Sequence, residues 1–187
     1  MSNNEMIKLI TGRRSIRRFQ PKPVEQEKAM TLLECAFAAP SSKNHRPCQF
    51  ILIDDSAKLQ EIGEAAPAAK MAAGAPLGIA VCVDVPAYEE KSGLTDSTWV
   101  MDASAAIENI LLAARALGLE GVWLQVMNRA DRESVIPRIL GVPDGVKLLF
   151  IALVGYPAEE KKPGGEIVAS RLHRNRWLSK QETSFVN

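Results

Sequence analysis

STWVMDASAAIENILLAARALG, residues 97–118, carries the clearest helical periodicity of the chain. Its apolar residues recur every three or four positions and cover much of the circumference, and the final glycine suits a left-handed helix end. A helix that is apolar over so wide a surface is normally buried, so we expect this segment at the centre of the core. The apolar positions are Ala103, Ala106, Ile107, Ile110, Leu111, Ala114 and Leu117.

Apolar runs on either side of this helix are typical of buried strands. We expect strands at residues 49–53, 77–83, 121–126 and 147–154, and further helices at residues 24–38, 56–63 and 132–140. Strands and helices that alternate along a chain indicate an α/β or α+β domain. Residues 65–76, which are rich in Ala, Pro and Gly, fit this scheme poorly.

The composition is that of one ordinary domain. The chain has 187 residues, 47% of them hydrophobic, and 23 basic against 22 acidic residues give a formal net charge of +1. This balance argues against a broad nucleic-acid-binding face. Cys35, Cys48 and Cys82 form no C-x-x-C pair, which favours a reducing compartment. With no signal-peptide pattern and no apolar run long enough for a bilayer, we expect a cytoplasmic protein without membrane contact.

The common catalytic motifs are absent from the sequence. His45 and His173 lie far apart and have no metal-ligand spacing to Cys or Glu, so we expect no metal site. No nucleophile elbow, P-loop or G-x-G-x-x-G fingerprint occurs. If the protein is an enzyme, we therefore expect a cofactor to supply its reactivity.

The segment RRSIRRF, residues 13–19, places four arginines and a serine within seven residues. No Asp or Glu occurs between Glu5 and Glu25, and the forked donors of arginine match phosphate and carboxylate groups. One interpretation is therefore an anion site, most simply for a phosphate. The other is a basic surface segment that is solvated or forms salt bridges.

A second polar segment, PSSKNHRP at residues 40–47, presents hydroxyl groups, an amide and cations between two prolines. Such groups can hydrogen-bond a polyol chain or the polar edge of a heterocycle. Ser41 and Asn44 are also ordinary turn and cap residues, so a purely structural interpretation stays open.

Together, these two segments resemble the paired signature of the FMN-dependent nitroreductase family. Later motifs follow in a similar order, namely Asp102 in an Ala-rich helix, GLEGVW at 118–123, GYP at 155–157 and NRW at 175–177. The resemblance covers nearly the whole chain. It implies a single α+β domain over residues 1–187 with three layers, in which helices flank a central, mostly antiparallel sheet. It also implies an intertwined homodimer with two FMN molecules at the subunit interface.

The resemblance further implies four groups of FMN-binding residues. At the phosphate or the electron-rich edge of the ring we expect Arg13, Arg14, Ser15 and Arg17. From the other subunit we expect Pro40, Ser41, Ser42 and Asn44. The backbone against the ring is expected from Glu120, Gly121 and Val122, and closure over the phosphate from Arg174 and Arg176.

The activity that the resemblance implies is NAD(P)H-dependent reduction of nitroaromatic, quinone or related acceptors, in two half-reactions through the flavin. No side chain is expected to act as an acid or base. Arg17 is expected to tune the flavin, Gly121 to admit the backbone close to the ring, and Arg18 to face solvent or form a surface ion pair. The alternative is a carrier or sensor that binds flavin or a phosphate ligand and has no nicotinamide oxidase activity.

Two regions depart from the family pattern or are matched less closely. Members often carry Gln-Pro-Trp where this chain has Arg46-Pro47-Cys48, so the departure bears on substrate preference more than on flavin binding. Cys48 itself is most simply a small core residue. Residues 157–187 are expected to wrap the partner subunit, and the alternative is disorder. The apolar anchors expected in this extension are Leu172, Trp177, Leu178 and Phe185.

Overall fold

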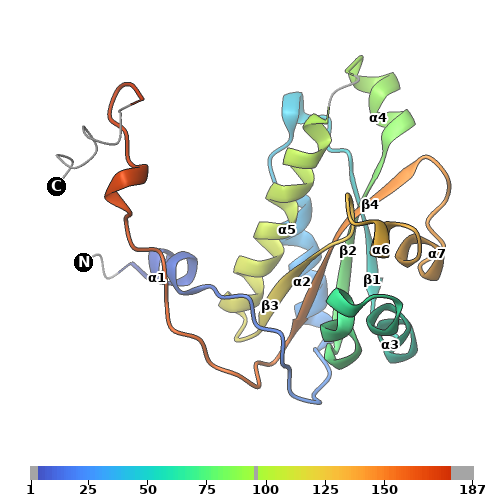
Figure 1. The fold of residues 1–187 in the computed structure, drawn as a ribbon, viewed down its shortest axis with the longest axis horizontal. Helices are drawn as coiled ribbons and strands as arrows, with labels where there is room; N and C mark the ends of the chain where they lie inside the picture. Colours follow the sequence, from blue (N-terminus) through green and yellow to red (C-terminus); the bar gives the residue numbers. More distant parts are fainter. Residues whose placement is uncertain (1–3, 95–96, 178–187) are drawn as a thin grey trace.

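A four-stranded antiparallel sheet forms the middle layer of the computed structural model, which describes residues 4–94 and 97–177 (Figure 1). In the spatial order β1-β2-β4-β3, the strands are β1 (Cys48–Ile53), β2 (Leu77–Asp84), β4 (Val146–Gly155) and β3 (Glu120–Gln125). The two central strands are buried on both faces, which explains their continuous apolar runs. Each strand lies within one residue of its expected bounds.

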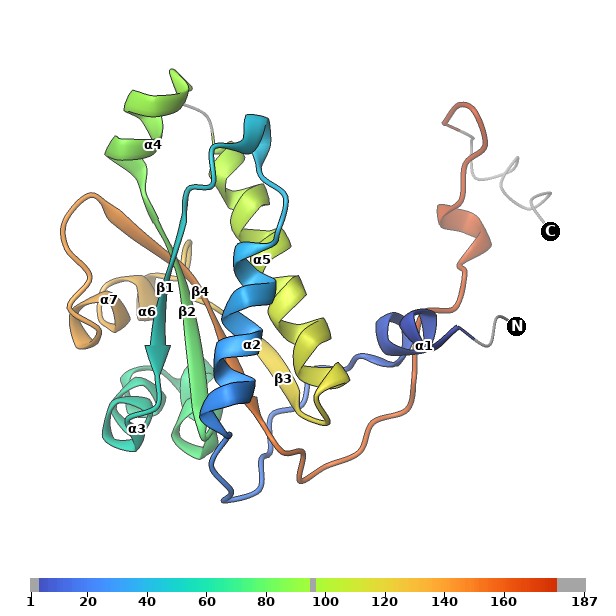
Figure 2. The same ribbon diagram turned by 180° about the vertical axis from the view of Figure 1, so that it is seen from behind.

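Helices cover both faces of this sheet and complete the three layers (Figure 2). Successive side chains of a strand point to opposite faces, so Ile79 and Val81 pack towards one helical layer while Ala80 packs towards the other. The first layer contains α2 (Gln26–Phe37) and α5 (Thr98–Ala116). The second contains α3 (Ser56–Ala65), the 3-10 helix η2 (Pro67–Gly74), α6 (Ala130–Glu133) and α7 (Ile136–Ile139). The expected α+β architecture is confirmed.

Helix α5 is the buried centre that its sequence predicts. Seven of its residues are buried, including the acidic Asp102, and they pack against α2 and the sheet. The helix ends where Leu117 caps it, and Gly118 follows with a φ of +73°. This is the left-handed conformation in which glycine avoids the steric cost of a Cβ.

Three local expectations change. Residues 132–140 do not form one helix, because Pro137 offers no N–H to a carbonyl of the preceding turn and the chain breaks into α6 and α7. Residues 65–76, which matched no element, contain η2, whose buried Ala69 and Ala72 pack on the second face. The helices α1 (Glu5–Gly12) and α4 (Val85–Ser92) were not expected.

The chain beyond β4 leaves the body of the domain. Phe19 forms a bridge with Pro157, and residues 158–177, which include η3 (Ala169–Arg171), then run past α1 and away from the sheet in both views (Figures 1 and 2). Of the expected anchors, Leu172 and Trp177 are exposed, the latter by 82%, whereas Leu178 and Phe185 lie outside the described residues. Wrapping of a partner subunit by this extension stays a prediction.

Within the described residues, no helix combines the length and hydropathy that a bilayer span requires.

Candidate functional site

The arginine segment, residues 13–19, lies along the exposed edge of the sheet. Ser15 forms a parallel bridge with Gly121 at the start of β3, and the Ile16 N–H donates to the Gly121 carbonyl at 3.0 Å. Ile16 itself is buried and fixes the segment in place. The structure therefore brings together two of the expected groups, residues 13–17 and residues 120–122, which are far apart in the sequence.

The beginning of the extension covers the same segment from the other side. The Arg17 N–H donates to Glu159 Oε1 at 2.7 Å, and Lys161 Nζ donates to the Ser15 carbonyl at 2.5 Å. Arg14 Nε donates to the Lys162 carbonyl at 2.8 Å. The arginine segment is thus held between β3 and the residues that follow β4.

The arginines of this segment have different surroundings. Arg13 Nε forms an ion pair with Glu108 Oε1 on α5 at 3.1 Å, while the half-buried Arg14 bonds mainly to backbone carbonyls. Arg17 is exposed, and among the described residues its guanidinium makes only one hydrogen bond, a long one of 3.4 Å to the Ser15 carbonyl. Arg18 is exposed as expected and forms no ion pair with a described residue. Arg17 is therefore the cation of the segment whose charge is best placed to meet an external anion.

Glu120, at the first position of β3, pairs with Arg115 at the end of α5 and not with the arginine segment. Arg115 Nη1 donates to Glu120 Oε1, and the other carboxylate oxygen of Glu120 is buried without a hydrogen bond to any described residue. Burial raises the pKa of the Glu120 carboxyl, and the charge of Arg115 opposes that rise. The charge of Arg115 thus opposes the effect of burial on a carboxyl group that lies directly beside the backbone expected to bind the ring.

Gly121 is required by packing against the core. A Cβ at this position would lie 2.8 Å from the Leu153 carbonyl oxygen and 2.9 Å from Leu111 Cδ2. The side-chain position therefore faces β4 and α5. Its neighbour Val122 is buried on the other face of the sheet. The structure thus gives a reason for the glycine that differs from the expected close approach to a flavin ring.

The loop of residues 40–47, which we call the proline loop, is fixed by its own polar groups. The Ser42 N–H donates to Asp102 Oδ1 at 2.9 Å, the Arg46 N–H donates to Ser41 Oγ at 2.9 Å, and Arg46 Nε donates to Asn44 Oδ1 at 2.8 Å. Lys43, Asn44 and Arg46 adopt φ values of 46°, 59° and 52°. Such backbone is uncommon for residues with a Cβ, although asparagine adopts it more readily than most, and strained residues of this kind cluster at functional sites.

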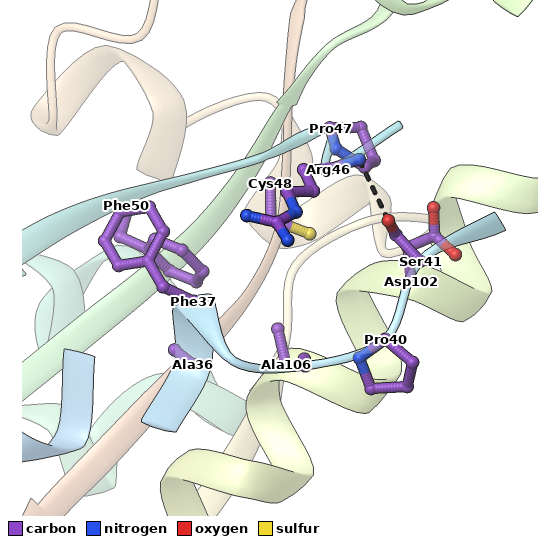
Figure 3. Close-up of a pocket in the computed structure, with 11 residues that line it drawn as sticks. Ala36, Phe37, Pro40, Ser41, Arg46, Pro47, Cys48, Phe50, Asp102 and Ala106 are labelled. Atoms are coloured by element: carbon purple, nitrogen blue, oxygen red, sulfur yellow. Dashed lines mark hydrogen bonds between the residues drawn. The ribbon is translucent and has the colours of Figure 1, made fainter. Parts of the chain in front are cut away.

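A hollow of about 220 Å³ lies behind the proline loop, between α2, β1 and α5 (Figure 3). Its lining is mostly apolar, and Phe37 and Phe50 meet edge to face with ring centroids 4.8 Å apart. Burial, with the Asp102 carboxylate adding to it, raises the pKa of the Cys48 thiol to about 12. Cys48 is therefore an uncharged, small wall residue at neutral pH. The sequence patterns did not predict this hollow. The available indication was Cys48, a small residue directly after Pro47.

The proline loop and the arginine segment lie towards opposite ends of α5. The loop meets Asp102 near the first turns, whereas Gly12, next to the arginine segment, packs against Arg115 in the last turn. At about 1.5 Å of rise per residue, these two positions are roughly 20 Å apart along the helix. One chain therefore does not bring residues 40–44 to the arginine segment.

Other expected residues lie elsewhere. Arg174 and Arg176 are exposed, and they belong to the extension, residues 158–177, which runs away from the sheet (Figure 1). Two aromatic residues of the middle of the chain belong to the core: Tyr88 on α4 is 3% exposed, and Trp99 on α5 packs against the same cluster. Among the described residues, no group of three or more His, Cys, Asp and Glu side chains is arranged to hold a metal ion.

Comparison with known proteins gives consistent matches over most of the chain. The model of the nitroreductase family matches residues 10–72 and 65–156. A protein of Archaeoglobus fulgidus, provisionally named NADH dehydrogenase/NAD(P)H nitroreductase, is 36% identical to this chain. The match covers 92% of this chain and 99% of the length of that protein. The FMN reductase (NAD(P)H) of Bacillus subtilis is 29% identical over 98% of this chain and 79% of its own. Among solved structures, an FMN-dependent nitroreductase of Clostridium difficile has a TM-score of 0.82 at 33% identity, over 91% of this chain and 99% of that chain.

Proposed function

Since this chain belongs to the nitroreductase family, we propose that it is an FMN-dependent oxidoreductase that uses NAD(P)H to reduce nitroaromatic, quinone or related acceptors. The names of its relatives support this reaction class, because they include an FMN reductase and an FMN-dependent nitroreductase. The observation that carries the proposal is the bridge between Ser15 and Gly121, which joins the arginine segment to the start of β3.

The chemistry of these residues fits FMN. The exposed Arg17 guanidinium has no carboxylate partner among the described residues, so it is available for a phosphate or for the electron-rich edge of the ring. Arg13, Arg14 and Ser15 would hold the same cofactor, with Arg13 exchanging its contact to Glu108 for the anion. FMN, when bound, supplies the capacity to accept hydride from NAD(P)H and to pass it to an acceptor in a second step.

The protein's own contribution is to bind and orient. The hydrogen bond from the Ile16 N–H to Gly121 fixes the edge of β3, so that the backbone of residues 120–122 is preorganised. Arg17 is an electrostatic group in this proposal, because a guanidinium near the ring stabilises negative charge there. No side chain is assigned a proton transfer.

We also propose that two copies of this chain complete each site. The proline loop lies roughly a helix length from the arginine segment of its own chain, so Pro40, Ser41, Ser42 and Asn44 would serve the flavin bound by the other copy. Exposed apolar side chains on α1, α2 and α5 support such an interface. They are Met6, Ile7, Ile10, Met30, Phe37 and Met101.

The extension has a place in this proposal. Arg174 and Arg176 would reach the phosphate from the segment that wraps the partner, and the 82% exposed Trp177 would be covered there. The free thiols of Cys35, Cys48 and Cys82 support a reducing compartment such as the cytoplasm.

The test is the absorbance spectrum of the purified protein before and after anaerobic addition of NADH or NADPH. We expect a flavin spectrum that NADH or NADPH bleaches and that a nitroaromatic or a quinone then restores. A flavin spectrum that neither nucleotide bleaches would favour the alternative, a carrier or sensor. A protein that does not retain FMN after reconstitution would exclude both the oxidoreductase and a flavin carrier, and would leave a carrier or sensor for another phosphate ligand.

A further inference from the structure

The side chain of Glu120 forms an ion pair that is only partly satisfied by hydrogen bonds. It is 14% exposed, and Arg115 Nη1 donates to its Oε1. Within the described part of the chain, nothing donates to the buried Oε2 of Glu120, and the buried Nε of Arg115 finds no acceptor. Such a pair gains little from burial, so the charge state of its carboxyl group depends strongly on the charges around it.

The ion pair lies beside the beginning of the arginine segment. The guanidinium of Arg115 packs against Gly12, where a Cβ would collide with it. On the other side, the residue that follows Glu120 forms the bridge to Ser15. The carboxyl group is thus held close to the two arginines that lie between these contacts in the sequence.

Charges from the neighbouring elements act on the Glu120 carboxyl in opposite directions. Burial raises its pKa, whereas Arg115 on α5 and, more weakly, Arg13 and Arg14 oppose that rise. The other charged groups that contact the arginine segment form ion pairs of their own. They are Glu108 on α5, which pairs with Arg13, and Glu159 and Lys161 after β4, which pair with each other.

An anion bound to the arginine segment would change this balance. A phosphate monoester such as that of FMN carries a charge of about −1.5 to −2 near neutral pH. In the proposed site Arg13 and Arg14 neutralise it, so they offer less positive charge to Glu120, and the phosphate adds repulsion. A carboxylate beside new negative charge binds a proton more readily.

On the basis of the proposed function, we infer that the Glu120 side chain takes up a proton from solvent when FMN binds, and that Arg115 keeps this side chain ionised until then. The proton forms an O–H bond with the carboxylate, and no electron is transferred. The exposed part of the side chain gives it access to water. The proposed function uses only the backbone of Glu120. By linkage, the contribution of this group to FMN affinity is present at low pH and is lost as the pH rises.

The experiment is calorimetric titration of the FMN-free full chain with FMN, between pH 5 and pH 8, in buffers of different ionisation enthalpy. The dependence of the heat on the buffer gives the number of protons taken up per FMN, and absorbance gives the amount of FMN bound. The phosphate itself titrates near pH 6, so the wild type is compared with Glu120→Gln at each pH. We expect the wild type to take up more protons. The ratio of its affinity to that of Glu120→Gln should fall by at least about threefold from pH 5 to pH 8.

Two further variants and a control separate this role from a structural one. Arg115→Gln removes the cation that keeps the carboxylate ionised, so Glu120 should already be protonated and the excess uptake should disappear although the carboxyl group is still present. Arg115→Gln/Glu120→Gln removes both charges, should show the proton count of Glu120→Gln, and replaces either single variant that does not fold. Glu61→Gln, in an exposed ion pair with Lys58 on α3, is the matched control and should take up as many protons as the wild type.

The inference is overturned if the wild type and Glu120→Gln bind FMN with equal proton counts over the whole pH range, and the proposed function would survive that result. It is also overturned if Arg115→Gln keeps the excess uptake. If the absorbance shows that the wild type binds no FMN, the proposed function is refuted, and this inference with it.

Discussion

Gly121→Ala tests whether the edge of β3 is packed as tightly as the structure indicates. The new methyl group would lie 2.8 Å from the Leu153 carbonyl oxygen and 2.9 Å from Leu111 Cδ2. The leucine side chain can rotate away, but the carbonyl belongs to the central strand β4 and can move only with that strand. The substitution therefore strains the sheet at the place where Ser15 and Ile16 attach.

The expected cost follows from two opposing contributions. Overpacking of a filled core costs about 1–3 kcal/mol. Replacing glycine restricts the unfolded chain, and this stabilises the protein by about 0.4–1 kcal/mol where the conformation allows it. We therefore expect a net loss of about 1–2 kcal/mol in the free energy of unfolding, or a melting temperature about 3–6 °C lower for a chain of this size.

The assay is urea unfolding followed by circular dichroism, at one protein concentration and one excess of FMN, because ligand and partner both shift apparent stability. Gly74→Ala is the matched control. A Cβ added at Gly74 would have no atom within 4 Å, and this glycine has no left-handed φ, so its variant should be neutral or slightly more stable. If Gly121→Ala is as stable as Gly74→Ala, the packing argument is wrong.

Two further predictions concern charges. Arg13→Gln should mainly weaken FMN retention, whereas Arg17→Gln should weaken it and also shift the flavin reduction potential, and Arg18→Gln is the control. If Arg13→Gln and Arg17→Gln lose affinity equally and leave the potential unchanged, the two arginines do not have these different roles. The Tyr156 hydroxyl donates to Glu25 at 2.8 Å, and the pKa of that carboxyl is lowered to about 2 by a hydrogen bond to its own backbone and then by Tyr156. The stability contributed by Glu25 is present above its ordinary pKa of 4.5 and is lost as the pH falls towards 2. We therefore expect the difference in melting temperature between the wild type and Tyr156→Phe to shrink as the pH falls from 4.5 towards 2. A constant difference across this range would exclude the Glu25 contact as its source.

The sheet and α5 could be predicted because burial on both sides leaves a plain apolar signal. The unexpected helices lack that signal. In α4 only Tyr88 is buried, although Asp84 caps its start by accepting the Ala87 N–H and Gly93 ends it with a φ of 67°. Those capping residues were the available evidence for α4. In α1 no residue is buried, so the described residues of this chain do not cover its apolar face.

The candidate site could be predicted as a set of motifs, and only partly as an arrangement. That the arginine segment lies beside residues 120–122 depends on one bridge at the edge of the sheet. The ion pair of Arg13 with Glu108 depends on how α5 passes that edge, which no local pattern encodes. The hollow behind the proline loop depends on side-chain volumes from three elements, and sequence patterns do not report on such volumes.

The central claim is that FMN is held by the arginine segment of one chain and the proline loop of another. We would pair a chain carrying Arg13→Glu and Arg17→Glu with a chain carrying Ser41→Glu and Asn44→Glu, purify the heterodimer with two different tags, and measure bound FMN. If the two segments come from different chains, the heterodimer keeps one intact site and should bind about one FMN, while both parent homodimers bind none. A heterodimer that also binds no FMN would contradict the shared site.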